Sequence, residues 1–282
     1  HGGTQSPEAS FNTEIRIAEI PGKTGFTGVQ PVDRAVAQGY VNASSEVIEA
    51  GVVPWMQFAV NPDGSYQSLS DYPLHAIRTD LTGPFHGMAL LSAAVDMGLA
   101  FEGKHSVADG YVTYEMAFWA NLGRGESFDG QQPATPTVRT FPCEGTQDVL
   151  PALFGEWLPT GELIPGRNLG MKPTASPIYI YGEYGTTLTI TTAQVVQVST
   201  GKEIPIAVSS TKATDGNHGS LFRESWAGFV LPDTPFIPLQ PYRVRVEGKS
   251  DSKPFVKEFT FTPGRYSFYD RGFWESLGLQ TQ

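Results

Sequence analysis

The sequence predicts a two-domain protein, with an α+β domain over residues 1–122 followed by an all-β sandwich domain over residues 137–282. The chain has 282 residues, which is enough for two separate hydrophobic cores. Glycine (31 residues) and proline (22 residues) are plentiful and only 17% of residues are charged, a composition that favours strands and loops over a helical bundle. Residues 123–136 are polar and rich in Gly, Gln and Pro, which indicates a linker between the domains.

The first domain combines helical and extended patterns. Three helices are predicted over residues 32–38, 44–50 and 85–91, and two strands over residues 97–101 and 111–118, with a polar turn at 103–110. Pro31 suits the first turn of the first helix. Ser44 or Ser45 is a suitable N-cap for the second helix, which carries Glu46 and Glu49. Helices beside a small antiparallel sheet make an α+β domain.

In the second domain the pattern becomes strand after strand. Short apolar or alternating runs, separated by Gly, Pro and Asp turns, predict strands at residues 179–181, 188–190, 193–198, 204–208, 227–231, 242–246 and 255–261. From Tyr242 to Val246, apolar and cationic residues alternate, as on a strand with one buried and one solvated face. A series of such short strands is typical of an immunoglobulin-like β-sandwich.

The charge of the chain argues against nucleic-acid binding, because the net charge is −10 and no cluster of Lys or Arg is present to neutralise phosphates. No stretch of about 18 apolar residues occurs, so we expect no membrane span. The single cysteine, Cys143, excludes an internal disulfide, and we interpret it as a small buried strand residue. The chain starts at His1 rather than Met, as expected for an exported protein that is secreted or displayed at the cell surface.

Several motifs of the first domain follow one another in a defined order. A glycine- and aromatic-containing loop at residues 25–28 precedes Arg34, Glu46 follows a pair of serines, and the run Pro84-Phe85-His86 comes later. In this order the motifs resemble the bacterial CAP superfamily, whose domains are also called SCP-like. The resemblance implies a CAP-like α-β-α sandwich for residues 1–122, with an open cleft.

The second domain carries a resemblance of its own. Its segments at residues 141–145, 226–232 and 238–244 resemble the Ig-like module that often follows bacterial CAP domains. This resemblance implies the same immunoglobulin-like sandwich for residues 137–282 that the strand pattern predicts.

The resemblance to the CAP superfamily also implies a site. By position in the motif, Glu46 matches the family glutamate and His86 its second histidine, so both are candidate catalytic and metal-binding residues. Imidazole and carboxylate suit a divalent metal such as zinc, which would hold a water for hydrolysis. The first family histidine falls at Ile17, so the motif supplies two ligands where a catalytic zinc usually takes three. His1 or His75 completes the set only if the fold brings it close.

Three further residues are candidates for ligand binding, namely Arg34, Glu49 and Trp55. Each candidate in the site also has a structural alternative. Glu46 suits a helix N-terminus through the helix dipole, and His86 suits a hydrogen-bonded structural role. Arg34 would hold its helix to a neighbouring loop, Glu49 would be a solvated surface residue and Trp55 would belong to the core.

Taken with the family resemblance, these residues predict a bacterial binding protein that is secreted or displayed at the cell surface. The expected ligand is an apolar or lipid-like small molecule, a wall polymer or a protein, held in a cleft where Glu46 and His86 approach within roughly 8 Å. The alternative is a metal-assisted hydrolase, with Glu46 as base or ligand and His86 as ligand. A minor alternative is a copper monooxygenase that uses His1 at the N-terminus.

Overall fold

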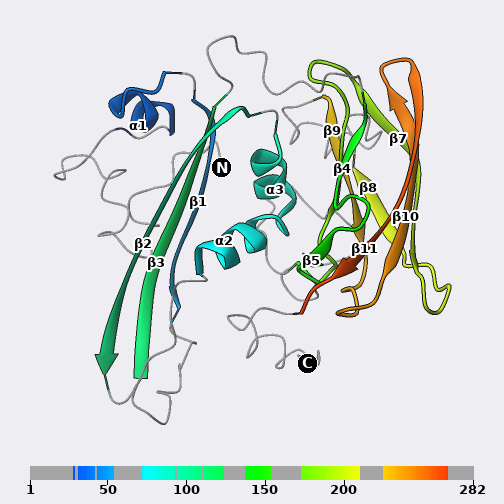
Figure 1. Ribbon diagram of the computed structural model, residues 1–282. Coiled ribbons are helices and arrows are strands. Elements are labelled where there is room, and N and C mark those ends of the chain that lie inside the picture. The colour runs from blue at the N-terminus through cyan, green and yellow to red at the C-terminus, as the bar shows by residue number, and fades with distance from the viewer. Residues whose placement is uncertain are drawn as a thin grey trace. The chain divides into compact units, whose positions relative to one another are not determined.

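The structure of the chain is a computed structural model (Figure 1). It describes residues 28, 31–41, 43–53, 72–92, 94–108, 111–123, 137–153, 173–209 and 225–265. The chain divides into two compact units, one made of His1–Asp80 with Ala89–Gln131 and the other of Leu81–Met88 with Gln132–Gln282. The segment Leu81–Met88, here called the docking segment, therefore belongs with the C-terminal part of the chain, which no motif in the sequence indicates.

The first unit is built on a three-stranded antiparallel sheet. Its described elements are α1 (Pro31–Ala37), β1 (Ala43–Val53), α2 (Tyr72–Asp80), β2 (Asp96–Ala108) and β3 (Tyr111–Gly123), while α3 (Pro84–Leu90) begins in the docking segment. The strand order is β1-β3-β2, so β3 is central. Strands β2 and β3 form one long hairpin, in register from Asp96 opposite Gly123 to Ala108 opposite Tyr111.

The α-β-α sandwich predicted for this part of the chain is wrong. The described residues form three helices of seven to nine residues and eleven strands, so helices do not provide two layers around the sheet. None of these described helices combines the length and the apolar character needed to cross a membrane. The helices predicted over residues 32–38 and 85–91 are confirmed as α1 and α3. The predicted strands are confirmed as β2 and β3. Both are longer than predicted, and β2 extends into the predicted turn at 103–110.

The clearest local error concerns residues 44–50, predicted as a helix and found in strand β1. Val47 and Ile48 are β-branched, and their restricted side-chain rotamers favour extended backbone. Strand β1 pairs with β3 from Ala43 to Val53. A serine N-cap contributes only about 1 kcal/mol to a helix, so pairing along the whole strand outweighs it.

The turn after α1 is tied to the start of β2. Gly39 has a φ of 84°, and the Tyr40 amide donates to the carbonyl oxygen of Ala35, a glycine-based helix C-cap. The hydroxyl of Tyr40 then donates to Oδ2 of Asp96 at 2.8 Å. The exposed Val41 that follows is thereby held at the same end of the sheet as the first residues of β2.

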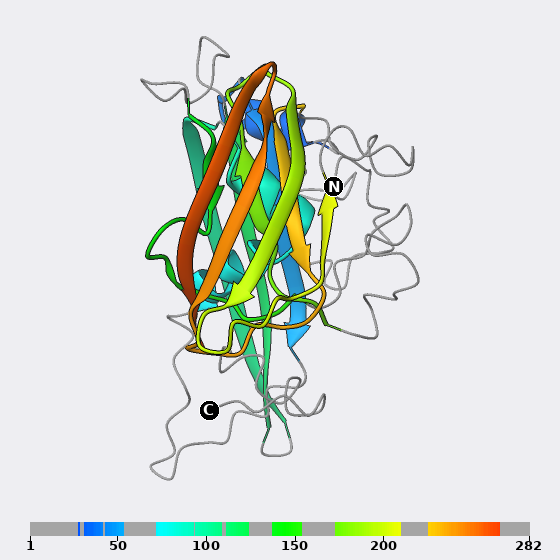
Figure 2. The same cartoon turned by 90° about the vertical axis from the view of Figure 1, so that its right-hand side faces the viewer.

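The second unit contains two four-stranded sheets (Figure 2). Its strands are β4 (Arg139–Phe141), β5 (Gln147–Val149), β6 (Ile178–Tyr181), β7 (Leu188–Gln197), β8 (Ile206–Ser209), β9 (Ala227–Pro232), β10 (Tyr242–Ser250) and β11 (Lys253–Pro263). The sheet orders are β5-β11-β10-β7 and β4-β6-β9-β8. With β4 and β5 taken as a split first strand, this order is that of strands A, B, E, D and C, F, G in the immunoglobulin fold.

The strands predicted after residue 178 are confirmed, with the runs at 188–190 and 193–198 joined into β7. A single core fills the space between the two sheets. At one end of it Phe236, Tyr242 and Phe261 pack together, with ring centres 4.6 to 6.1 Å apart. The amide of Ile237 donates to the hydroxyl oxygen of Tyr242 at 2.8 Å. This contact, at the start of the penultimate strand, is the tyrosine corner of immunoglobulin-like sandwiches.

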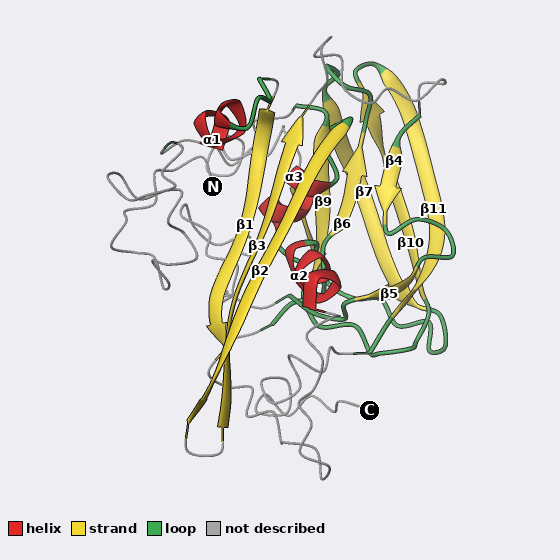
Figure 3. Cartoon of the chain, turned by 60° about the vertical axis from the view of Figure 1, so that its left-hand side comes forward, coloured by secondary structure: helices red, strands yellow, loops and turns green. Residues whose placement is uncertain are grey.

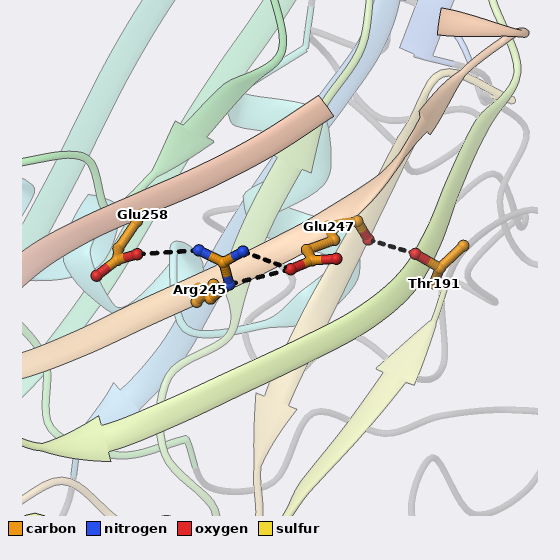
Figure 4. A network of polar contacts seen from close by, with 4 residues as sticks. All are labelled: Thr191, Arg245, Glu247 and Glu258. Carbon is orange, nitrogen blue, oxygen red and sulfur yellow. Dashed lines mark hydrogen bonds and ion pairs between the residues drawn. The ribbon is translucent and has the colours of Figure 1, made fainter. Parts of the chain in front are cut away.

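The outer face of the sheet that contains β10 is polar and exposed. Along β10 the buried and exposed residues alternate, which confirms the prediction made from Tyr242 to Val246. Arg245 donates to Glu247 at 2.6 Å and to Glu258 at 3.1 Å, and the hydroxyl of Thr191 donates to the carbonyl oxygen of Glu247. Figure 4 shows these contacts. Exposed ion pairs of this kind contribute little to stability, so they mark a solvated face.

Candidate functional site

Strand β6 is buried on both of its faces. Its residues alternate, so Ile178 and Ile180 lie in the core between the sheets, whereas Tyr179 and Tyr181 lie on the opposite face. These tyrosines are nonetheless only 0% and 4% exposed. On β9, Phe229 lies opposite Tyr179 and is also buried. The outer face of this sheet is therefore covered by another part of the chain.

The docking segment provides this cover, and Figure 3 shows α3 beside β6 and β9. The single hydroxyl proton of Tyr179 is shared between the carbonyl oxygens of Gly83, at 2.8 Å, and Leu81, at 3.0 Å. The hydroxyl of Tyr181 makes a longer contact, 3.4 Å, with the carbonyl oxygen of Met88. Two neighbouring tyrosines of one strand thus hold the backbone of the docking segment at both of its ends.

Two residues explain how the docking segment approaches the sheet so closely. Pro84 takes the first position of α3, where its missing N–H costs no helical hydrogen bond. Gly87 is buried one turn later. A Cβ atom added at Gly87 would lie 2.5 Å from Cζ of Tyr179 and would overlap the hydroxyl oxygen. Only glycine at this position leaves room for the tyrosine ring against the helix.

His86, the histidine that the motif singled out, lies on this helix and is half-buried. Helix α3 has seven residues, and a helix of that length is not stable by itself in water. Its conformation therefore depends on the contacts of the docking segment with Tyr179 and Tyr181. The position of the helix that carries His86 is therefore fixed by the sandwich.

The other predicted site residues lie in or near the first unit. Glu46 and Glu49 are both on strand β1 and not on the helix predicted for them. Arg34 lies on α1, and Trp55 lies outside the described residues.

Glu46 and His86 do not lie on neighbouring helices as predicted, because Glu46 is on a strand. The two residues belong to different compact units, so the predicted separation of roughly 8 Å stays a prediction. In the described part of the chain, no group of three or more His, Cys, Asp or Glu residues is placed to hold a metal ion. His1 and Ile17 lie outside the described residues, and His75 lies on α2. The zinc site also stays a prediction.

Cys143 is exposed rather than buried, which corrects its interpretation as a buried strand residue. It lies in the turn between β4 and β5, where its amide and its Sγ both contact Oγ1 of Thr146. Its place in a turn outside the sheets explains why Cys143 is exposed.

Tyr179 and Tyr181 contact the docking segment that carries His86, and neither is among the residues predicted from the sequence. The sequence does contain a signal, since residues 178–181 read Ile-Tyr-Ile-Tyr. A strand with one solvated face usually alternates apolar and charged residues. Two large aromatic residues on the second face instead indicate that this face is covered, and their hydroxyl groups then require polar partners.

Comparison with known proteins gives no family assignment. No family model matches the chain, and no curated protein matches it. The resemblance to the CAP superfamily rests on motif residues of this sequence and stays a prediction.

The buried tyrosines of the sandwich make its stability depend on pH. Burial raises the pKa of Tyr181, against an opposing effect of the Arg139 guanidinium, and burial also raises the pKa of Tyr242. An unfolded tyrosine titrates near pH 10. The folded state keeps these protons to higher pH, so stability is full below about pH 10 and falls above it, by up to about 1.4 kcal/mol per pH unit for each tyrosine.

The variant Tyr181→Phe is therefore expected to flatten this alkaline loss of stability. The measurement is the free energy of urea unfolding as a function of pH between about 9 and 12. The free energy of unfolding should fall more steeply with pH in wild type than in the variant. A pH dependence caused by Tyr242 remains in both proteins. Equal slopes in the two proteins would contradict a buried, protonated Tyr181.

Proposed function

We propose that this chain is a binding protein whose recognition surface is centred on His86. The proposal rests on one observation: the sandwich holds α3 in place. It does so through the hydrogen bonds of Tyr179 and Tyr181 to the docking segment. A side chain that is already held in place loses little conformational freedom when a ligand binds. Rigid support of this kind is what recognition sites require of the residues around them.

The surroundings of His86 on its own helix favour an amphipathic ligand. Ala89 and Leu90, three and four residues further along, share a helix face with His86, and all three residues are half-buried. The imidazole offers a hydrogen-bond donor and, when neutral, an acceptor. A ligand with one polar group and an apolar body would place the polar group on His86 and the body along Leu90.

The motif resemblance supports the same class of function. The bacterial CAP superfamily, which the segments around Arg34, Glu46 and His86 resemble, is associated with binding more than with one reaction. The hydrolase alternative needs a metal with three protein ligands. Among the residues that the structure describes, no group of three or more His, Cys, Asp or Glu residues is placed to hold a metal ion.

Side-chain NMR of 15N-labelled histidines tests the proposal, with decanoate as the amphipathic probe. We expect decanoate to shift the imidazole resonances of His86, and its affinity to fall about tenfold in His86→Ala, as expected when one hydrogen bond to a charged group is lost. The matched control is His218→Ala, which should keep the wild-type affinity. Probe-induced shifts that leave His86 unchanged, or an affinity for decanoate that His86→Ala leaves at the wild-type value, would contradict the proposal.

A second arm of the experiment separates binding from metal-assisted hydrolysis. Zinc chloride and EDTA are added separately while the melting temperature is followed. The binding proposal expects no response to either reagent. A rise in melting temperature with zinc that disappears in His86→Ala would favour the hydrolase, because a ligated metal stabilises the folded state.

A further inference from the structure

The docking segment interrupts the first unit of the chain. Leu81–Met88 packs with the sandwich, although the residues up to Asp80 and the residues from Ala89 onward both belong to the first unit. Half of the segment is buried, namely Thr82, Gly83, Pro84 and Gly87. A short stretch whose chain neighbours lie in one unit therefore completes the other unit.

The contacts of the docking segment do not depend on which copy of the chain supplies it. The hydroxyl groups of Tyr179 and Tyr181 bind three backbone carbonyl oxygens of the segment, and the ring of Tyr179 fits against Gly87. The segment of a second copy carries the same groups and makes the same contacts. An exchange of such an element between two copies therefore requires no new surface.

The linker is the part of the chain that an exchange would redirect. Residues 123–136 join the last strand of the first unit to the sandwich, and their composition is that of a flexible connection. A fully extended chain of this length spans about 45 Å, which lets the segment reach another copy. A short flexible tether gives its own segment an effective concentration in the millimolar range. A second copy competes with it at similar protein concentrations.

We propose that two copies of this chain exchange their docking segments, so that the segment of each copy covers Tyr179 and Tyr181 of the other. The exchange is isologous, because both copies give and receive the same element. His86 of each copy is then held by the sandwich of the other copy, and each candidate site needs both chains. This proposal rests on the contacts of the docking segment and not on the ligand proposed above.

Refolding of the full-length chain from urea at two protein concentrations tests the exchange. We expect monomer after refolding at about 10 µM and a substantial fraction of dimer after refolding at about 1 mM, where a second copy matches the tethered segment in concentration. Translational diffusion, measured by NMR at each refolding concentration, reports the size. A reductant is present throughout, because the exposed thiol of Cys143 would otherwise link copies through a disulfide.

An intermolecular nuclear Overhauser effect identifies the surface that the dimer uses. One copy is deuterated except at 13C-labelled tyrosine rings, the other copy is protonated and unlabelled, and the two are mixed before unfolding. A Cβ atom at Gly87 would lie 3.0 Å from Cε2 of Tyr179, so the α-protons of Gly87 lie close to the ring. We expect a signal between the labelled ring of Tyr179 and the α-protons of Gly87 in the concentrated sample.

The length of the linker gives a second test, which leaves the docking contacts intact. Deletion of residues 126–133 hinders the segment from reaching its own sandwich, so dimer should form at a protein concentration lower by about tenfold or more. The matched control replaces residues 126–133 by a Gly-Ser sequence of equal length and should behave like wild type. Melting temperatures check that both variants fold.

Dimer at high concentration with the intermolecular signal, and its shift to lower concentration in the deletion variant, would support the exchange. Wild type that stays monomeric at about 1 mM would overturn it, because the tether no longer has the advantage there. A dimer without the signal between Tyr179 and Gly87 would overturn it as well, because that dimer would use another surface.

Discussion

The variant Gly87→Ala is expected to destabilise the protein by about 3 kcal/mol, although helix propensity alone would predict the opposite. In an exposed helix, replacing Gly by Ala stabilises by about 1 kcal/mol. At Gly87 the added methyl group would overlap the hydroxyl of Tyr179, which is fully buried and has no room to move. The clash pushes α3 off the sheet and breaks the tyrosine hydrogen bonds to Gly83 and Leu81.

Urea unfolding followed by circular dichroism measures this loss. The matched control is Gly98→Ala, because a Cβ atom at Gly98 would meet no atom within 4 Å. We expect this control to lie within about 0.5 kcal/mol of wild type, as for most surface substitutions. A Gly87→Ala protein as stable as the control, or more stable than wild type, would show that the docking segment does not lie against Tyr179.

The variant Gly248→Ala is expected to be at least as damaging, by about 3 kcal/mol or more. Gly248 lies on β10, where the pairing with β7 shifts register between Glu247 and Gly248. A Cβ atom there would overlap the carbonyl oxygen of Thr189 and would lie 2.8 Å from Cζ of Phe255. The obstacle is backbone of the neighbouring strand, which no side-chain rotation removes.

Gly185→Ala separates this steric effect from backbone strain. Gly185 has a φ of 82° but open space where a Cβ atom would stand, so alanine there should cost only about 1 to 2 kcal/mol for the left-handed conformation. Gly248 shows no positive φ, and its cost should come from the clash alone. Chemical denaturation that finds Gly248→Ala no worse than Gly185→Ala would contradict the observed packing of β10 on β7.

The sandwich could be predicted from the sequence because its strands carry local signals. From Tyr242 to Val246 the alternation of apolar and cationic residues reports which face is buried, and the structure confirms it. The structure of the first unit was harder to predict, because residues 44–50 contain both a serine N-cap and β-branched residues. Pairing of β1 with β3 decides the structure of this segment, and the paired residues Glu46 and Asn121 are far apart in the sequence.

In the candidate site, too, local sequence signals predict the helix, whereas contacts between residues far apart in the sequence cannot be predicted from them. The helix that carries His86 is predicted over residues 85–91 and is confirmed as α3. The contact of the docking segment with the sandwich is not predicted from the sequence. Tyr179 and Gly83 are 96 positions apart, and no local pattern joins them. The order of motifs that resembles the CAP superfamily also led to a helix at Glu46, where the structure has a strand.

The central claim is that the sandwich holds the helix of His86 in place, and hydrogen exchange at the Gly87 amide tests it most directly. This amide donates to the carbonyl oxygen of Gly83 at 2.8 Å. In an isolated seven-residue helix it would exchange almost as fast as in an unfolded peptide. In wild type we predict that the Gly87 amide is protected almost as strongly as the core amides of β6. Tyr179→Phe removes one buried hydrogen-bond donor and should lower this protection about tenfold or more. The protection of the Val244 amide in β10 should stay unchanged. Fast exchange at Gly87 in wild type, or protection that Tyr179→Phe leaves unaltered, would contradict the claim.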